Sequence, residues 1–150
     1  MRIYSYCLLL LIAISPISNA GHSVLHQSVN NLDIYLAVIP AEMIRGHPAE
    51  HFESQMHGGV PDDNNHFHIM VSVFNKTTKK PVADASIMAK VVGQKYTGSL
   101  QKLERMIIEG KSSFGNYFTV PKDETFNIAV KIQTKNSDDA IDTIFVWGRT

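Results

Sequence analysis

Residues 66–74 read His-Phe-His-Ile-Met-Val-Ser-Val-Phe, a stretch in which two kinds of side chain alternate. In an extended strand, successive side chains point to opposite faces. One face of this stretch is therefore apolar, since it holds the side chains at positions 67, 69, 71 and 73. The opposite face begins with His66, His68 and Met70, which are residue types that bind metals. We predict a strand with one face in a core and the other face available for a site.

Similar stretches occur along most of the chain, and polar turns separate them. Residues 32–39 are rich in strand-forming side chains. Residues 82–92 follow the polar turn at 75–81 and are predicted to pair with residues 67–74 as a hairpin. Residues 96–108 have a spacing that a helix could also use, but we interpret them as a strand.

Three more strands are expected near the C-terminus, at residues 114–120, 125–133 and 142–147. About seven short strands with polar turns between them, and no long helix, are typical of an all-β sandwich. We predict an immunoglobulin-like antiparallel β-sandwich that forms one domain over residues 32–150.

The segment 41–65 differs from the rest because it contains two prolines and three glycines and has no sustained periodicity. A loop of this length inside a compact domain is usually functional or disordered. Residues 47–70, which include most of it, contain five of the seven histidines, and no histidine follows residue 68. Imidazole, thioether and carboxylate groups together suit copper and, with fewer sulfurs, iron or zinc. We therefore predict a long metal-binding loop.

The start of the chain has the three parts of a secretory signal peptide. A basic residue, Arg2, is followed by an apolar run over residues 7–14 and then by Ser18-Asn19-Ala20. Ser18 and Ala20 provide small side chains at the two positions that a signal peptidase recognises. The apolar run is too short for a permanent membrane-spanning helix. We predict a signal peptide over residues 1–20, export to the periplasm, and a flexible N-terminal segment over residues 21–31.

Composition narrows the chemistry of any site. Cys7 is the only cysteine and lies in the predicted signal peptide, so we expect neither a disulfide nor a thiolate ligand in the mature chain. The full chain has 14 basic and 14 acidic residues, not counting histidine. Because this balance provides no basic field, we expect no binding to nucleic acid.

Several ligand-type side chains have a spacing that turns them the same way. His51 and Glu53 are two residues apart, and His57 follows just before two glycines, where the chain can curl. Glu104 and Met106 are also two apart, although a single methionine is more often core filler than a ligand. We consider all of them candidate ligands.

Simpler explanations exist for the same residues. Exported loops often contain histidines as solvated polar groups. The face with His66, His68 and Met70 is equally compatible with a polar sheet surface or with a dimer contact.

The sequence His51-x-Glu53-x-x-x-His57 resembles the ligand segment of the periplasmic iron-transport proteins. These are small copper- and iron-binding immunoglobulin-like proteins of Gram-negative bacteria that work beside an inner-membrane iron permease. The resemblance extends over residues 35–116, and it includes a methionine followed at a short distance by the pair Phe114-Gly115.

This resemblance implies a set of ligands and a homodimer. Matched position by position, His51, Glu53 and Met106 would bind the metal, with His57 and Met43 nearby. The chain departs from the family in two places, because Ser113 stands where the family has a histidine and no C-terminal histidine is present. The site would then use His57, His66 or His68, bind more weakly, or prefer another ion.

Three functions remain open on this basis. The leading hypothesis is a periplasmic protein that captures copper, ferrous iron or both in support of an inner-membrane transporter. The alternative is an exported protein-interaction module whose histidines respond to acidic pH. We do not expect an enzyme, because the sequence has no nucleophile elbow or phosphate-binding loop.

Overall fold

A computed structural model describes residues 23–46, 55–121, 125–135 and 137–148 of the chain. The predicted signal peptide and the candidate ligands His51 and Glu53 lie outside the described residues. No helix within these ranges is long and apolar enough to cross a bilayer.

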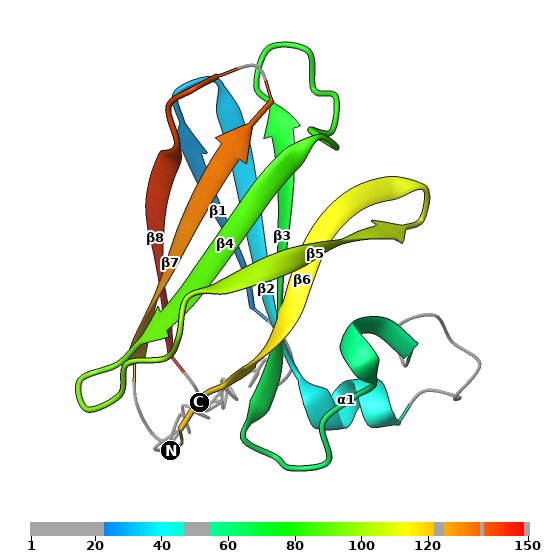
Figure 1. Cartoon of the computed structure of the whole chain (residues 1–150), viewed down its shortest axis with the longest axis vertical. Coiled ribbons are helices and arrows are strands. Elements are labelled where there is room, and N and C mark those ends of the chain that lie inside the picture. The colour runs from blue at the N-terminus through cyan, green and yellow to red at the C-terminus, as the bar shows by residue number, and fades with distance from the viewer. Residues whose placement is uncertain (1–22, 47–54, 122–124, 136, 149–150) are drawn as a thin grey trace, which may run out of the picture.

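The described chain is an all-antiparallel β structure, and the predicted immunoglobulin-like sandwich is confirmed (Figure 1). The strand order is β1-β2-β3-β6-β5-β4-β7-β8. Between β2 and β3, the described residues include the short helical turns α1 and η1. The elements are β1 (Ser23–Val29), β2 (Leu32–Pro40), α1 (Ala41–Arg45), the 3-10 turn η1 (Met56–Gly58), β3 (His66–Asn75), β4 (Ala85–Val92), β5 (Gln101–Ile108), β6 (Lys111–Thr119), β7 (Thr125–Thr134) and β8 (Ile141–Gly148).

Strand β5 joins the two layers because its two halves pair with different strands. Residues 101–103 pair with β4, whereas residues 104–108 pair with β6. The β4-β7-β8 layer and the β1-β2-β3-β6 layer therefore face each other (Figure 1). At the opposite edge the side chain of Gln27 in β1 donates a hydrogen bond to the carbonyl oxygen of Ile144 in β8, at 2.7 Å.

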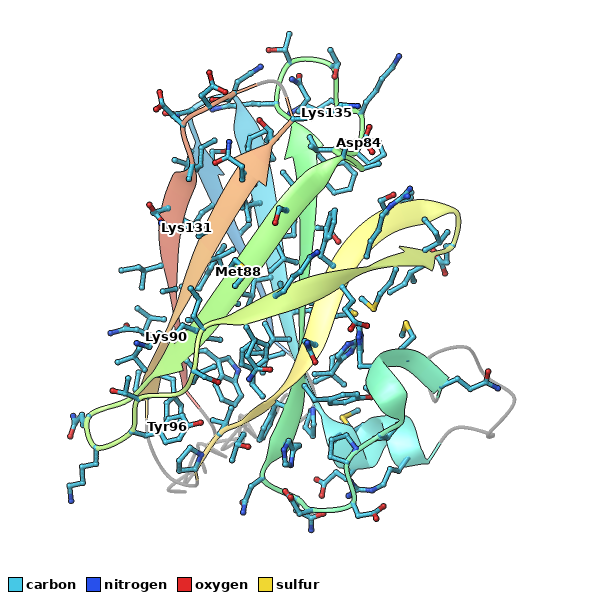
Figure 2. All side chains as sticks on the ribbon, viewed as in Figure 1. Asp84, Met88, Lys90, Tyr96, Lys131 and Lys135 are labelled. Atoms are coloured by element: carbon cyan, nitrogen blue, oxygen red, sulfur yellow. The ribbon has the colours of Figure 1, made fainter. Side chains whose placement is uncertain are left out.

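The core lies between the layers because each strand turns alternate side chains inward. On β4, Ile87, Ala89 and Val91 are buried, whereas Met88 and Lys90 lie on the outer face (Figure 2). Aromatic rings fill the centre of the core. The ring of Trp147 meets the ring of Phe67 edge-on at a centroid distance of 5.1 Å and stacks on that of Phe126 at 6.2 Å.

Two sequence predictions about local structure are wrong. Residues 23–29 form β1 rather than part of a flexible segment, because they pair along their whole length with β2 across a tight turn. Asn30 occupies the left-handed region in that turn, with φ 53°, which asparagine tolerates better than most residues.

The predicted hairpin between residues 67–74 and 82–92 forms only next to its turn, where Phe74 bridges to Pro81 and the amide of Val82 donates a hydrogen bond to the carbonyl oxygen of Val73. The rest of β3 pairs with β2 and β6, and β4 lies in the other layer, where it pairs with β5 and β7. The side-chain oxygen of Asn75 holds that turn by accepting hydrogen bonds from the backbone amides of Thr77 and Thr78.

Asp33 on β2 is a buried carboxylate that links three segments. It accepts hydrogen bonds from the Ser28 hydroxyl and from Lys79 Nζ at 3.0 Å, and His26 Nε2 lies 3.5 Å from its oxygen. The Ser28 hydrogen bond and then the Lys79 hydrogen bond lower the pKa of Asp33 to about 2, from an ordinary value near 3.8.

We expect Asp33→Asn to lower the melting temperature at neutral pH. Because the folded-state pKa of Asp33 lies below the unfolded value, its stabilisation is present above about pH 4 and is lost as the pH falls towards 2. The difference between wild type and variant should therefore disappear by about pH 2 in thermal unfolding followed by circular dichroism. Asp142→Asn is the control, since that carboxylate is exposed and 3.7 Å from Lys131. A difference that stays constant from pH 7 to pH 2 would contradict the assignment.

Candidate metal centre

Three of the predicted ligands meet on the outer face of the β3-β6-β5 sheet. His57 comes from η1, His68 from β3 and Met106 from β5. In Figure 1 the helical turns lie beside the end of the sheet where β2 stops and β3 begins. His57 Nε2 lies 3.3 Å from Met106 Sδ, and the rings of His57 and His68 have a centroid distance of 5.1 Å. Side chains that are far apart in the sequence therefore converge at one point.

The backbone of η1 turns the side chain of His57 inward by adopting an energetically unfavourable conformation at this residue. His57 is in the left-handed region, with φ 56° and ψ 29°, and the next two residues, Gly58 and Gly59, also have positive φ. Such a conformation costs a non-glycine residue about 1–2 kcal/mol and persists where surrounding contacts impose it. The side chain of His57 is only 2 % exposed as a result.

Glu104 determines how the imidazole of His57 is presented. Its carboxylate oxygen lies 2.8 Å from His57 Nδ1, and its side chain is 61 % exposed. Because a carboxylate can only accept a hydrogen bond, Nδ1 of the ring is the donor and Nε2 of the neutral ring has a free lone pair. That lone pair is next to the sulfur of Met106. Two electron-pair donors therefore lie close together, as the ligands of a single metal ion do.

His68 is a buried imidazole with an unused nitrogen. The residue is 2 % exposed, and Nε2 has no hydrogen-bond partner among the described residues. An unpaired buried polar atom of this kind costs about 1–3 kcal/mol, and in native structures such atoms are rare and are explained by strain, by a chemical role or by a bound water or ion. Burial, and then the charge of nearby His57, lowers the pKa of His68 to about 4. His68 is therefore uncharged at neutral and mildly acidic pH, as a metal ligand must be.

Gly115 on β6 allows His68 and Met106 to approach each other. A Cβ at this position would lie 2.8 Å from His68 Nε2 and 2.8 Å from Met106 Cε. In the register of the sheet, Gly115 faces Met70 on β3 and Glu104 on β5. The absence of a side chain here creates the space that the two ligand-type groups share.

Tyr117 forms one wall of the cluster. Its ring lies 4.8 Å from the ring of His68 and 5.9 Å from that of His57, measured between centroids. Ala41 and Ile44 of α1 pack with Tyr117 in a small apolar cluster separate from the main core. The helix therefore shields this side of the site.

Arg45 joins the two ends of the long loop. Its guanidinium donates hydrogen bonds to the carbonyl oxygen of Pro61 and, at 2.8 Å, to the side-chain oxygen of Asn64. These bonds fix the end of α1 to the segment that leads into β3.

The remaining predicted ligands are placed differently. His66 uses both ring nitrogens elsewhere, since Nδ1 is 2.8 Å from an oxygen of Asp63 and Nε2 is 3.2 Å from the hydroxyl of Thr119. Met43 is 45 % exposed on α1. Ser113, which the resemblance pairs with a family histidine, lies opposite Met106 and shares a hydrogen bond with Ser72 at 2.8 Å.

The described residues contain no group of three or more His, Cys, Asp or Glu side chains that could hold a metal ion. The cluster reaches three donors only when the thioether of Met106 is counted. Glu104 was considered a candidate ligand, but its contact with His57 was not predicted, and Gly115 was not predicted to be part of the site. The spacing of Glu104 and Met106 was a signal for Glu104, whereas Gly115 could be found only from the strand register.

Fold and cluster together define an immunoglobulin-like sandwich with a histidine and methionine site on one outer face. No protein-family model matches the sequence, and no curated protein matches it. The fold is similar to that of a DUF4426 family protein from Pseudomonas aeruginosa PAO1, with a TM-score of 0.63, 20 % identity, and coverage of 87 % of this chain and 96 % of that one.

The fold is also similar to that of FetP from uropathogenic Escherichia coli strain F11. A copper-bound variant of FetP gives a TM-score of 0.62 at 8 % identity, covering 85 % of this chain and 96 % of that one. FetP expressed in the periplasm gives 0.62 at 9 % identity, with coverage of 87 % and 97 %. At these identities the likeness establishes a shared fold.

We expect Gly115→Ala to weaken metal binding without removing any ligand. The added methyl group would overlap both His68 Nε2 and Met106 Cε, so at least one of them must move. Calorimetric titration with copper should show affinity reduced by about tenfold or more, similar to the loss of an outer-sphere contact. Gly98→Ala, whose nearest neighbour is the tyrosine side chain of Tyr96, is the control. Equal affinities for the two variants would show that the close approach is not required.

Proposed function

We propose that this chain is an exported protein that binds copper, ferrous iron or both and supports uptake of the metal by an inner-membrane transporter. The observation that supports it most is the buried, unpartnered Nε2 of His68 beside the His57 and Met106 pair. A structural histidine would be expected to use that nitrogen in a hydrogen bond. A ligand that awaits its metal would not.

The arrangement is suited to capture and release rather than to permanent retention. Glu104, next to the inner donors, is more than half exposed, so a cation can approach from solvent on that side. His57 also comes from η1, which lies outside the sheet that contains His68 and Met106. A small movement of η1 relative to the sheet would open the site, which is what delivery to a transporter requires.

The proposed location and metal binding are supported by the pattern at the start of the chain and by the similarity of the fold to FetP. The start of the chain has the pattern of a signal peptide. The FetP neighbours include a copper-bound form and a form recombinantly expressed in the periplasm of Escherichia coli BL21(DE3). Binding and delivery, rather than catalysis, are the proposed activity, and an inner-membrane iron permease is the proposed partner.

His68→Leu tests the metal site directly. We expect the affinity for copper or ferrous ion, measured by calorimetry on the metal-free protein, to fall by about tenfold or more. The metal-free variant should be at least as stable as wild type, because the substitution removes an unpaired buried nitrogen that costs about 1–3 kcal/mol.

His66→Leu is the matched control for this experiment. It removes an imidazole on the same face of the same strand, but one that is hydrogen-bonded to Asp63 and Thr119. We expect it to leave the metal affinity unchanged. If His68→Leu binds metal as tightly as wild type, or if neither ion binds wild type, the proposed function is wrong.

We also propose that the chain forms a homodimer, as the resemblance implies. The outer face of the sheet supports this, since Tyr35 on β2 is 38 % exposed there although it is large and mostly apolar. Multi-angle light scattering with and without metal should give twice the mass of one chain. A single-chain mass under both conditions would contradict it.

A further inference from the structure

The donors that meet at the candidate metal centre share two properties. They are two imidazole nitrogens and one thioether sulfur, so none of them has a formal charge in its metal-binding form. They are also shielded from water, because His68 and Met106 are each 2 % exposed and the side chain of His57 is 2 % exposed. Among the described residues, the carboxylate that contacts this cluster is that of Glu104, and it is bonded to the far nitrogen of His57.

This donor set distinguishes between cations by charge. The cost of transferring an ion from water to a poorly hydrated site rises steeply with its charge. Uncharged donors recover less of that cost for a divalent ion than carboxylates do. A singly charged ion is therefore the better match to a buried site with three uncharged donors.

The same donor set also distinguishes between metal ions by their softness and by the number of ligands that they require. Thioether sulfur prefers soft ions and selects Cu(I), whereas iron and other harder ions favour carboxylate and water ligands. Cu(I) has a filled d shell and accepts as few as two or three ligands. Ferrous iron and Cu(II) require more donors, and the described residues provide no group of three His, Cys, Asp or Glu.

Building on the proposed function, we propose that His57, His68 and Met106 form a site selective for monovalent copper, Cu(I), in which Glu104 orients the imidazole of His57. Met106 provides the selectivity, because replacing its sulfur would leave only the two imidazoles. Glu104 is a positioning residue, since it acts through the ring of His57 rather than on the metal.

Selectivity can be measured on the metal-free protein without oxygen. Cu(I) affinity is obtained by competition with bicinchoninate, ferrous affinity by competition with ferrozine, and Cu(II) affinity by calorimetry. We expect tight Cu(I) binding and much weaker binding of the two divalent ions. Each tenfold preference for Cu(I) over Cu(II) should raise the reduction potential of the bound copper by about 59 mV.

Met106→Leu should lower the Cu(I) affinity by about tenfold or more and remove the sulfur signal from the copper X-ray absorption spectrum. Met88→Leu is the matched control, because Met88 is a partly buried thioether on β4 in the other layer (Figure 2). If both variants bind Cu(I) as wild type does, or if wild type prefers Cu(II) or ferrous ion, the Cu(I) proposal is overturned while metal binding stands. If no ion binds, the proposed function itself fails.

The role of Glu104 has its own test. Glu104→Gln keeps an oxygen that can accept from His57 Nδ1, whereas Glu104→Leu does not. We expect the Gln variant to retain most of the Cu(I) affinity and the Leu variant to lose about 10–100-fold, the range for outer-sphere partners. Equal losses in the two variants would instead indicate that the charge of Glu104 acts on the metal directly.

Discussion

Strand β3 contributes to the core and to the candidate metal centre at the same time, because alternate side chains of a strand point to opposite faces. Phe67 and Ile69 are buried between the two layers, and His68 lies between them in sequence and faces the other way. Moving β3 by one residue would put His68 into the core and expose the phenylalanine. The packing of the core therefore fixes the position of His68, a side chain on the other face of the sheet.

The neighbouring strands complete the site through the same register. His68 on β3 lies opposite Tyr117 on β6, and Gly115 on β6 lies opposite Glu104 on β5. Because backbone hydrogen bonds hold these pairings, the sheet sets the relative positions of the backbone at His68 and Met106. Only His57 enters from outside the sheet, on a turn with a strained backbone.

Much of this could be predicted from the sequence, and the limits have physical causes. The alternation over residues 66–74 predicted both faces of β3, and the histidine-rich loop and Met106 were recognised as ligand types. His66 and His68 could not be distinguished from the sequence, because they share a face of β3. They differ in the residues that contact or face them, which are Asp63 and Thr119 for His66 and Tyr117 for His68.

Other features depended on strand pairing, which a single sequence does not reveal. Gly115 is important because of what approaches it from β3 and β5, and nothing local indicates that. Strand β1 was missed because the Asn30-Asn31 turn that folds it back onto β2 is only two residues long and contains no glycine. The hairpin between residues 67–74 and 82–92 was favoured by sequence proximity, but it is limited to the Phe74–Pro81 bridge because β6 pairs with β3 over residues 66–71.

The divided pairing of β5 has a consequence for how this protein can change over evolution. Leu103 anchors the first half of the strand in the core, whereas the second half pairs only with β6 and extends beyond the β4-β7-β8 layer (Figure 1). Mutations at Glu104 or Met106 therefore alter groups outside the main hydrophobic core. A lineage could replace the donors of the proposed metal site along this ribbon while the sandwich that supports them stays the same.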